Sequence, residues 1–453
     1  MEEKNHWMID VNEQENPWII QVNNQVKEIE DISMEEIEKN RWQRRSIYKV
    51  PESVKNLKGK EKTYKPQVVS FGPYHYKDEK LAPMEEHKDR ALLHFLKRTK
   101  KSVQSYYASL VDVVEELKEA YESLDHDLEK DSDEFLRIMI RDGVFMLEIL
   151  KYSYNENNFG VYAPNDPVFS DHGKLYVMPL IRRDMLMLEN QLPMLVLHKL
   201  LAVEKGLTKE NEDFTNALVY RFFFPRTHSK PPSNCLHILD MYRKSLLQPT
   251  AQNPRNSPTP AAAAIADVRD DIIRSAIELT EAGITIKRAR SRNITDITFH
   301  NGILKIPMII VDDITETLFS NLVAFERFHV GAGNEVSWYV FFMDNIIDNA
   351  QDVGLLSSRK IIQNCIGSDK EAAKLFNSLA KDVMLDPECS IRMLCVDING
   401  YCQKRWPRYR ANLIQNYFRS PWALLSVIAA IVLFALTIQQ SVYTTLDYHK
   451  PNM

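Results

Sequence analysis

The amino-acid sequence predicts a mainly α-helical, α-rich α+β protein: a helical body, a small β-hairpin element and one C-terminal transmembrane helix. Three observations support this fold class. Apolar residues recur at three- and four-residue spacing in several long segments. The dipeptide Asn301-Gly302 separates two short segments of alternating apolar and polar residues. No Asp, Glu, Lys or Arg lies between Arg419 and Asp447.

The predicted organisation has four parts. Residues 1–45 form an acidic flexible arm, since positions 1–40 hold eleven acidic and three basic residues. The body, 46–418, is divided by the Pro-, Ala- and Asn-rich stretch 248–264, which predicts a linker. This linker separates a helical N-terminal part, 46–247, from a C-terminal part, 265–418, that contains the hairpin. Residues 419–443 form the transmembrane helix and 444–453 a short tail.

Helices are expected wherever apolar side chains line one face. Such patterns occur over residues 81–98, 102–124 and 133–152. Residues 184–201 predict two helical pieces, because Pro193 suits only the first turn of a helix. Asn190 is the expected cap of the second piece.

The hairpin and two helix starts carry the clearest local signals. Two capping boxes are expected, Asp313 with Glu316 and Ser368 with Glu371. A two-residue type I′ turn at Asn301-Gly302 gives the hairpin one apolar and one polar face. The expected cross-strand pairs are Phe299 with Leu304, Ile297 with Ile306, and Thr298 with Lys305.

The C-terminal apolar segment is long enough to cross a bilayer. Its strongest part, Trp422 to Ile438, has 17 residues, and extension to Tyr443 gives 22 residues, or about 33 Å of helix. A buried core helix is the alternative, but the segment is apolar all round rather than along one stripe. The residues expected in the membrane are Trp422, Ala423, Leu424, Leu425, Val427, Ile428, Ile431, Val432, Leu433, Phe434, Leu436, Ile438 and Tyr443.

The flanks of this segment predict its orientation. Positive charge stays on the cytosolic side of a membrane, so the body should be cytosolic and the protein tail-anchored in the plasma membrane or an endomembrane. No secretory signal peptide is visible at the N-terminus. The sequon at Asn293 would then stay unmodified, whereas a lumenal body would allow a glycan there. The basic residues of the upstream flank are Lys404, Arg405, Arg408, Arg410 and Arg419.

Composition narrows the function classes. A net charge of −5 argues against general nucleic-acid binding, which needs a basic surface. Phosphate-binding, hydrolase and metalloprotease motifs are absent, so no cofactor, metal or small-molecule substrate is indicated. The cysteines have neither zinc-site nor disulfide spacing and are expected to be reduced thiols. They are Cys235, Cys365, Cys389, Cys395 and Cys402.

Three groups of polar residues are candidates for chemistry. His87 and His94, near Glu85 and Glu86, share a helix face and suit either a metal site or ordinary surface positions. Asp312, Asp313 and Glu316 suit either paired catalytic carboxylates or helix capping. Asp142, Glu148 and Glu189 stand among apolar residues, so basic partners are expected unless the group is a functional site. The expected partners are Arg137, Arg141, Arg182 or Arg183.

Ten segments occur in an order that is typical of one protein family: "IYKVP", "VVSFGPYHY", "MEEHK", "RDGVFMLEIL", "LENQLP", "ELTEAGI", "IIVDDITETLFSNLVAFER", "FMDNIIDNAQDV", "IGSDKEAAKLFNSL" and "RANLIQNYFRSPWALLSVIAA". Through these segments the chain resembles a plant family called domain of unknown function 247, the UPF0481-type membrane proteins, from about Ile47 to Tyr443. Val144 stands where that family usually has a cysteine, so the cysteine is not an essential nucleophile here. The resemblance implies a plant protein with one C-terminal membrane helix, and some members of the family sit at grass self-incompatibility loci.

Two functional hypotheses follow, from different classes. The first is a membrane-anchored protein-recognition or signalling module with an unknown protein partner, related to self-incompatibility-type recognition. The second is a membrane-tethered enzyme that uses Asp142, Glu148, Glu189 or Asp312. Carboxylates that converge in a pocket would favour the enzyme, and carboxylates tied up in ion pairs and caps would favour the recognition module. A purely structural scaffold is a third interpretation.

Overall fold

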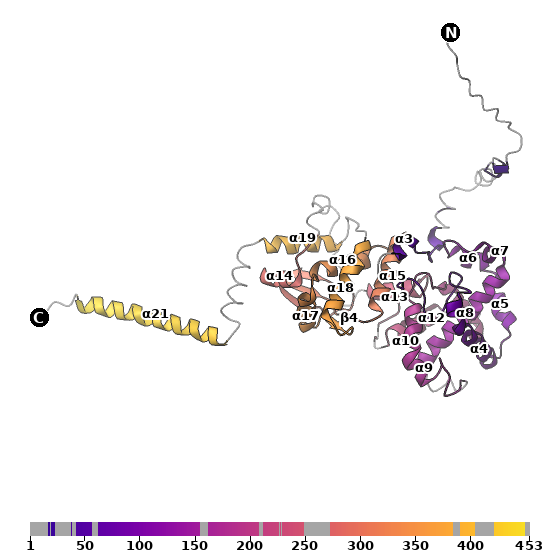
Figure 1. Ribbon diagram of the computed structural model, residues 1–453, viewed down its shortest axis with the longest axis horizontal. Coiled ribbons are helices and arrows are strands. Elements are labelled where there is room, and N and C mark those ends of the chain that lie inside the picture. Colours follow the sequence, from indigo (N-terminus) through magenta and orange to yellow (C-terminus); the bar gives the residue numbers. More distant parts are fainter. Residues whose placement is uncertain are drawn as a thin grey trace, which may run out of the picture.

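The computed structural model describes residues 42–56, 62–154, 162–207, 212–225, 227, 229–248, 272–383, 390–403 and 421–448, with a few positions before residue 42. The predicted acidic arm lies almost wholly outside these residues, and the predicted linker 248–264 does so apart from Gln248. The described structure is mainly helical with five short strands, which confirms the predicted fold class. Figure 1 shows the helical body and a separate C-terminal helix.

The N-terminal part is a bundle of helices around α8 (Ser132–Tyr154). This helix is buried along nearly its whole length and packs against α4, α5, α11 and α12. Gly143 allows α8 and α11 to pack closely, because a Cβ at this position would lie 2.6 Å from Leu200 Cδ1 and 2.9 Å from Val196 Cγ1 of α11. The other helices are α3 (Glu52–Lys55), η1 (Glu79–Leu81), α4 (Ala82–Thr99), α5 (Val103–Val111), α6 (Val114–Glu119), α7 (His126–Lys130), α9 (Asp171–Tyr176), α10 (Met178–Asp184), α11 (Met194–Lys205), α12 (Glu212–Phe223) and α13 (Ile238–Leu246).

The C-terminal part combines helices with two small sheets. The strands are β1 (Thr285–Arg288), β2 (Thr298–His300), β3 (Ile303–Ile306), β4 (Ile309–Val311) and β5 (Ile362–Asn364). The helices are α14 (Ala276–Glu281), α15 (Thr315–Phe328), α16 (Glu335–Ile346), α17 (Ala350–Ser358), α18 (Asp369–Leu379), η5 (Ala380–Asp382), α19 (Ser390–Cys402) and the separate α21 (Pro421–Tyr448). Both parts contribute to one apolar core.

The predicted hairpin is confirmed. Strands β2 and β3 are antiparallel, with Phe299 opposite Leu304 and Thr298 opposite Lys305. Asn301 and Gly302 have φ angles of 50° and 75°, the left-handed pair that a type I′ turn requires. The β2–β3 ladder stops at Thr298, so the expected pair of Ile297 with Ile306 does not form, although both side chains are buried and Ile306 pairs with Arg288 of β1.

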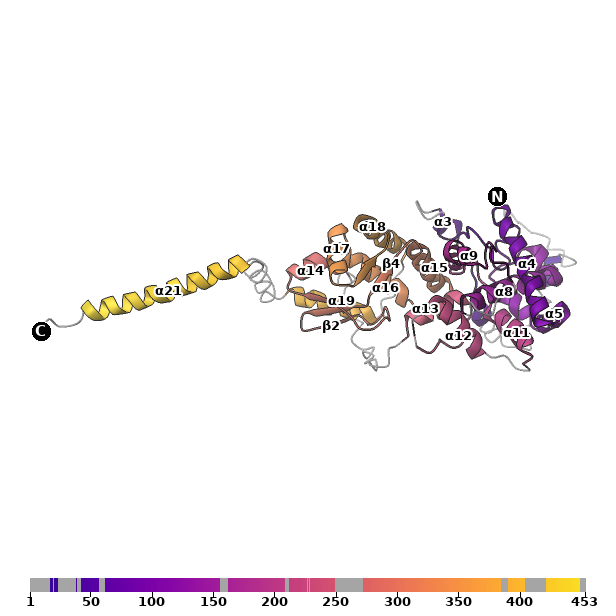
Figure 2. The same ribbon diagram turned by 90° about the horizontal axis from the view of Figure 1, so that it is seen from below.

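The hairpin belongs to a larger sheet that the sequence did not predict. Strand β1 pairs in parallel with β3, which gives the order β1-β3-β2, and β4 pairs in parallel with β5. Parallel pairing joins segments that are distant in the sequence. Figure 2 shows β2 beside α19 at the end of the body that lies toward α21.

Four local predictions were wrong. The expected helix 102–124 divides into α5 and α6, because Val113 leaves the helical region with φ −121°. Of the two helical pieces expected over 184–201, only the second forms, since α10 ends at Asp184 and α11 begins at Met194. Asn190 does not cap α11, whose N-cap residue is Pro193. Asp313 does not cap α15, whose N-cap residue is Ile314 without a side-chain cap. Ser368 does cap α18, since its hydroxyl accepts from the Glu371 amide at 3.4 Å.

Candidate functional site

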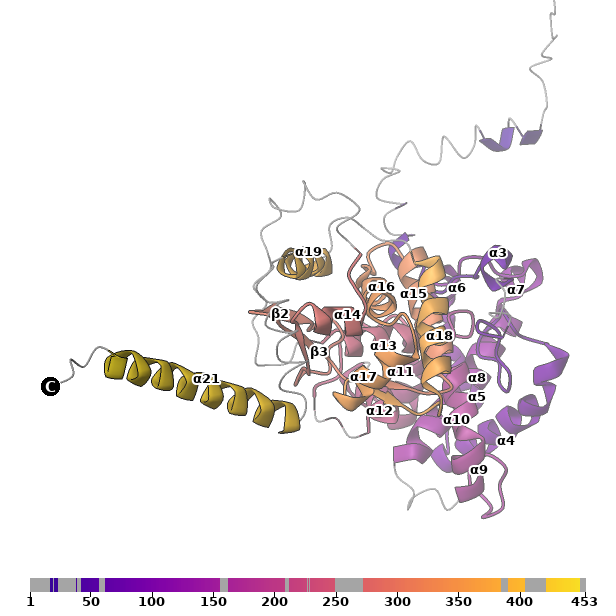
Figure 3. The ribbon, with the colours of Figure 1, turned by 60° about the vertical axis from the view of Figure 1, so that its left-hand side comes forward.

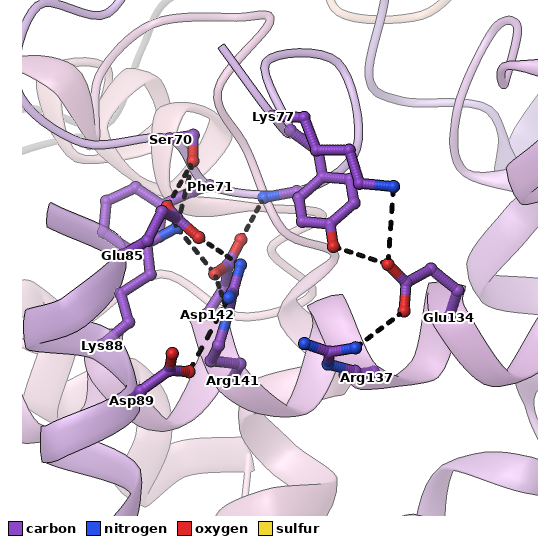
Figure 4. Close-up of polar contacts among 12 residues, drawn as sticks. Ser70, Phe71, Lys77, Glu85, Lys88, Asp89, Glu134, Arg137, Arg141 and Asp142 are labelled. Carbon is purple, nitrogen blue, oxygen red and sulfur yellow. Dashed lines mark hydrogen bonds and ion pairs between the residues drawn. The ribbon is translucent and has the colours of Figure 1, made fainter. Parts of the chain in front are cut away.

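A buried charge network joins α4 and α8 at the centre of the N-terminal bundle. The Lys88 ammonium is fully buried and lies 2.8 Å from Asp142 Oδ1 and 2.7 Å from Glu85 Oε1. It also donates a hydrogen bond to Ser70 Oγ at 3.0 Å. Arg141 forms a close ion pair with Glu85, so each carboxylate has a cationic partner. Figure 4 shows these side chains converging between the two helices.

Asp142 connects this network to the loop that precedes η1. Its Oδ2 accepts a hydrogen bond from the Gly72 amide at 2.9 Å. Burial raises the pKa of Asp142 above its ordinary value, and Lys88 opposes that rise. Gly72 has φ 78°, and a Cβ there would lie 2.8 Å from the Gln191 carbonyl oxygen, so only glycine fits this turn. The Lys88–Asp142 ion pair, together with the bond to Gly72, therefore fixes the position of this loop and the spacing of α4 and α8.

The network resembles a serine–lysine pair in composition but differs from one in chemistry. Ser70 Oγ donates to Glu85 Oε1 at 3.1 Å and accepts from Lys88. An ammonium held between two carboxylates has no lone pair with which to take the serine proton. As arranged here, these groups cross-link the bundle.

The other predicted carboxylates lie at separate positions, each with its own partner. Glu148 receives two hydrogen bonds from the Arg98 guanidinium and one from Tyr162 Oη at 3.0 Å. Glu189 lies 2.8 Å from Lys55 Nζ and accepts from the Val50 amide at 2.6 Å.

The pKa of Glu189 reflects this environment. Burial acts to raise it, but His75 and Lys55 lower it below the ordinary value. Paired carboxylates were predicted and are found, although only Arg141 among the four predicted arginines lies beside any of these three carboxylates.

Asp312, His87 and His94 also have structural partners. Asp312 Oδ1 accepts from the Thr315 hydroxyl at 2.8 Å, beside the start of α15. His87 Nδ1 lies 3.1 Å from Arg90 Nη2, and the His94 ring lies 4.7 Å from that of Tyr162. Among the described residues no group of three His, Cys, Asp or Glu side chains has metal-binding geometry.

A second polar cluster, which sequence reasoning missed, occupies the turn between α10 and α11. We call residues 184–191 the central turn. Asp184 Oδ2 accepts from the amides of Gln67, Val68 and Val69 at 2.7–3.1 Å. Asn190 accepts from the Phe71 amide at 2.7 Å, and Gln191 accepts from the Leu239 amide at 3.1 Å. Glu189, Asn190 and Gln191, the polar residues of "LENQLP", therefore accept hydrogen bonds from backbone amides that are distant in the sequence.

The N-terminal and C-terminal parts meet at a contact that we call the seam, centred on α13 and α15. Arg243 donates to Glu326 at 2.8 Å and to Glu335 at 2.5 Å. Glu326 also accepts from the Ser337 amide and hydroxyl at 2.8 and 2.7 Å. Burial raises the pKa of Glu326, and Arg243 opposes this effect.

Two histidines complete the seam. His237 Nδ1 accepts from the Asp240 amide at 3.2 Å, and Nε2 lies 3.1 Å from the Ser46 carbonyl oxygen. Because that oxygen only accepts, Nε2 carries the proton and the ring is neutral. Burial lowers the pKa of His237 to about 4. His329 stacks on Phe325 at 5.0 Å, and burial lowers its pKa as well.

Helix α21 differs from every helix of the body. It is the one described helix long and apolar enough to cross a membrane, and no residue of the window Ile428–Thr445 is buried. Leu433 and Phe434 are 65% and 70% exposed. The helix runs from Pro421 to Tyr448, five residues beyond the predicted end at Tyr443. Figure 3 shows it separate from the body, which disagrees with the alternative of a buried core helix.

Two sequence features bear on the orientation in the membrane, the basic flank before α21 and the sequon at Asn293. The basic flank from Lys404 to Arg419 lies outside the described residues. Asn293 is buried, and its Nδ2 donates to the Leu247 carbonyl oxygen at 3.1 Å. Its Oδ1 accepts from the Thr295 amide and hydroxyl, both at 2.9 Å. A folded body thus hides this sequon whichever side of a membrane it occupies.

These features define a class of protein with a helical body, a minor sheet layer and an unpacked apolar helix near the C-terminus. The chain belongs to the DUF247 family, described as plant protein of unknown function, which matches residues 47–436.

Two relatives from Arabidopsis thaliana align along most of the chain. UPF0481 protein At3g47200 is 29% identical over 431 residues, which cover 89% of this chain and 86% of that protein. Putative UPF0481 protein At3g02645 is 23% identical over 505 residues, which cover 90% of each chain. No solved structure matches the chain.

Proposed function

We propose that the protein is a membrane-anchored recognition or signalling module, in which α21 crosses the membrane and the body binds another protein. The observation that supports this proposal is the exposed apolar surface of α21. Outside a membrane, side chains such as Leu433 and Phe434 would face water, whereas a bilayer would cover them. At about 1.5 Å per residue the 28 residues of α21 extend about 42 Å, enough for the hydrocarbon core and both interfaces.

The carboxylates of the body support recognition over the enzyme alternative, because their oxygens are engaged by structural partners. Asp142, Glu148 and Glu189 each have a cationic partner, and Asp312 bonds to Thr315. A network of this kind stabilises a scaffold and leaves the surface to make the specific contact. The narrower proposal of self-incompatibility-type recognition is supported by the family resemblance alone.

The proposed orientation places the body in the cytosol. Its support is the sequence: five basic residues precede α21, whereas one acidic and one basic residue follow its apolar part. The protein would then be tail-anchored, with the end of the chain beyond the membrane.

Anchoring is tested by placing charge at the centre of α21. The full chain should resist alkaline extraction from plant membranes. Val432→Arg with Leu436→Arg should release it, because each arginine at mid-membrane opposes insertion by about 3 kcal/mol. The control is Val442→Arg with Thr445→Arg, whose side chains reach the interface and should leave the chain embedded. Equal extraction of both double variants would contradict a transmembrane α21.

Orientation is tested with two new sequons, since Asn293 is hidden. One is appended with a linker after Met453. The other is created by Lys100→Asn, which uses Ser102 in an exposed turn where residue 100 has φ 55°, a left-handed conformation that asparagine accepts. We expect a glycan on the appended sequon and none in the body. A glycan on the body site with a bare tail would reverse the topology.

Recognition is tested by proximity labelling in plant cells. The full chain and the Val432→Arg, Leu436→Arg variant have the same body but differ in membrane attachment. We expect a protein labelled only by the anchored chain. Identical labelling patterns would contradict a partner that is recognised at the membrane.

A further inference from the structure

One face of the β1-β3-β2 sheet carries like charges that have no partner. Lys287 on β1 and Lys305 on β3 are direct neighbours in the parallel register, and both are exposed. Arg288, the last residue of β1, and Arg290, just after the strand, are also exposed, but Arg288 lies on the opposite face from Lys287 because side chains alternate along a strand. In the part of the chain that the structure describes, these four side chains form neither an ion pair nor a hydrogen bond. We call Lys287 and Lys305 the basic face, with Arg288 and Arg290 as further positive charges beside it.

The basic face contrasts with the composition around it. Residues 284–310 contain five Lys or Arg and one acidic residue, Asp296, in a chain whose net charge is −5. Like charges on adjacent strands destabilise a sheet. The Lys287–Lys305 pair therefore does not stabilise the fold. A bound anion would offset the repulsion between the two ammonium groups.

The basic face lies on the part of the body that is connected to α21. Helix α19 packs on β2, and the rings of Phe299 and Tyr401 lie 5.5 Å apart. Helix α19 ends at Cys402 and α21 begins at Pro421, so the intervening chain reaches at most about 65 Å. Figures 2 and 3 show β2 at the end of the body nearest to α21.

We propose that the basic face binds anionic lipid headgroups of the membrane in which α21 is anchored, and so holds the body against that surface. This inference rests on the proposed anchoring. Cytosolic leaflets carry a negative surface potential that attracts lysine and arginine within a Debye length, about 8 Å at physiological salt. The basic flank from Lys404 to Arg419 is on the same side of α21 and adds to the attraction.

Lysine footprinting of the full chain tests the inference. The protein is reconstituted in vesicles of phosphatidylcholine, with or without about one-third phosphatidylserine, and labelled with an amine-acylating reagent. Acylation of Lys287 and Lys305 should fall roughly three-fold in the anionic vesicles, and about 0.5 M salt should restore it. Lys77 and Lys374 are the internal controls, exposed side chains on other elements whose labelling should not change.

A charge-reversed variant links the protection to the basic face. Lys305→Glu gives Lys287 an opposite charge beside it, so the protein should stay folded with an unchanged or higher melting temperature. Lys287 should then lose its phosphatidylserine-dependent protection. The matched variant Lys374→Glu, on α18, should keep that protection.

The outcomes separate this inference from the proposed anchoring. A chain that does not float with vesicles of either composition would overturn the anchoring. A chain that is embedded in both, with equal labelling of Lys287 and Lys305, would overturn only the lipid contact. Protection by added poly-glutamate but not by anionic vesicles would assign the basic face to an acidic protein and also overturn the lipid contact.

Discussion

The bundle around α8 and the sheet of the C-terminal part differ in how their charged side chains are placed: the first buries them in pairs and the second exposes them without partners. In the bundle, Lys88 and Asp142 are removed from water and each lies against an opposite charge. On the sheet, Lys287 and Lys305 face water beside a like charge. Burial makes an unpaired charge very unfavourable, whereas water screens an exposed one. Pairing in the bundle is thus required by folding, while the free charges of the sheet remain available to a partner.

Breaking the buried pair gives the largest expected effect. Lys88→Met leaves Asp142 buried without its main cation, which should lower the free energy of unfolding by about 3–5 kcal/mol. The matched change on an exposed pair, Lys374→Met, should cost less than about 0.5 kcal/mol, because Lys374 and Glu371 are mostly in solvent. Thermal unfolding of the detergent-solubilised full chain compares the two.

A double variant tests the assignment to charge. Lys88→Met with Asp142→Asn removes both charges and keeps an acceptor for the Gly72 amide. It should be more stable than Lys88→Met alone. If the double variant is the less stable of the two, the loss reflects packing of the lysine stem rather than an unpaired carboxylate.

The seam between the two regions should weaken in acid. The pKa of His237 is about 4 in the folded protein, below the ordinary 6.5, so the unfolded chain binds the proton more tightly. The neutral ring's contribution is complete above pH 6.5 and is lost as the pH falls from 6.5 toward 4. Between pH 7 and pH 5 the loss is about 2 kcal/mol. The lowered pKa of His329 acts in the same direction.

His237→Asn keeps a cap for the Asp240 amide but does not titrate. Unfolding followed as a function of pH should show a shallower acid loss in this variant than in the parent chain. Parallel curves for the two proteins would place the acid sensitivity elsewhere.

Two helical glycines give the smallest effect and should differ in sign. Gly143→Ala gains about 1 kcal/mol of helix propensity, but its Cβ would overlap Leu200 and Val196, which costs about 1–3 kcal/mol. The net result should be a loss of about 1 kcal/mol. Gly354→Ala, on α17, meets only Asp369 Oδ2 at 3.5 Å and should raise stability by up to about 1 kcal/mol. Stabilisation by both substitutions would show that α8 and α11 have room to separate.

The sequence predicted best where local chemistry decides the structure. The Asn301-Gly302 turn fixed the hairpin register, and the Ser368 hydroxyl started α18 as expected. Helix α8 was predicted despite Gly143, because its apolar residues continue on both sides of the glycine. Paired partners for Asp142, Glu148 and Glu189 followed from the cost of buried charge.

Prediction failed where distant segments decide. Lys88 lies on α4, fifty-four positions before Asp142, and no sequence spacing identifies it as the partner. The parallel pairing of β1 with β3 depends in the same way on tertiary packing. Asn190 resembled a cap in the sequence but bonds to the backbone of Val69 and Phe71 instead. The central turn left one signal, four polar residues in an otherwise apolar stretch.

From the seam we expect that the body can be assembled from two polypeptides. Arg243 and His237 belong to a fragment that ends at Gln248, whereas Glu326 and Phe325 belong to one that begins at Ile272. Each fragment alone would expose the apolar and charged groups that the other covers, so complementation is favoured. Only the second fragment carries α21. On the proposed anchoring the first would become a peripheral subunit, held at the membrane only through its contact with the second.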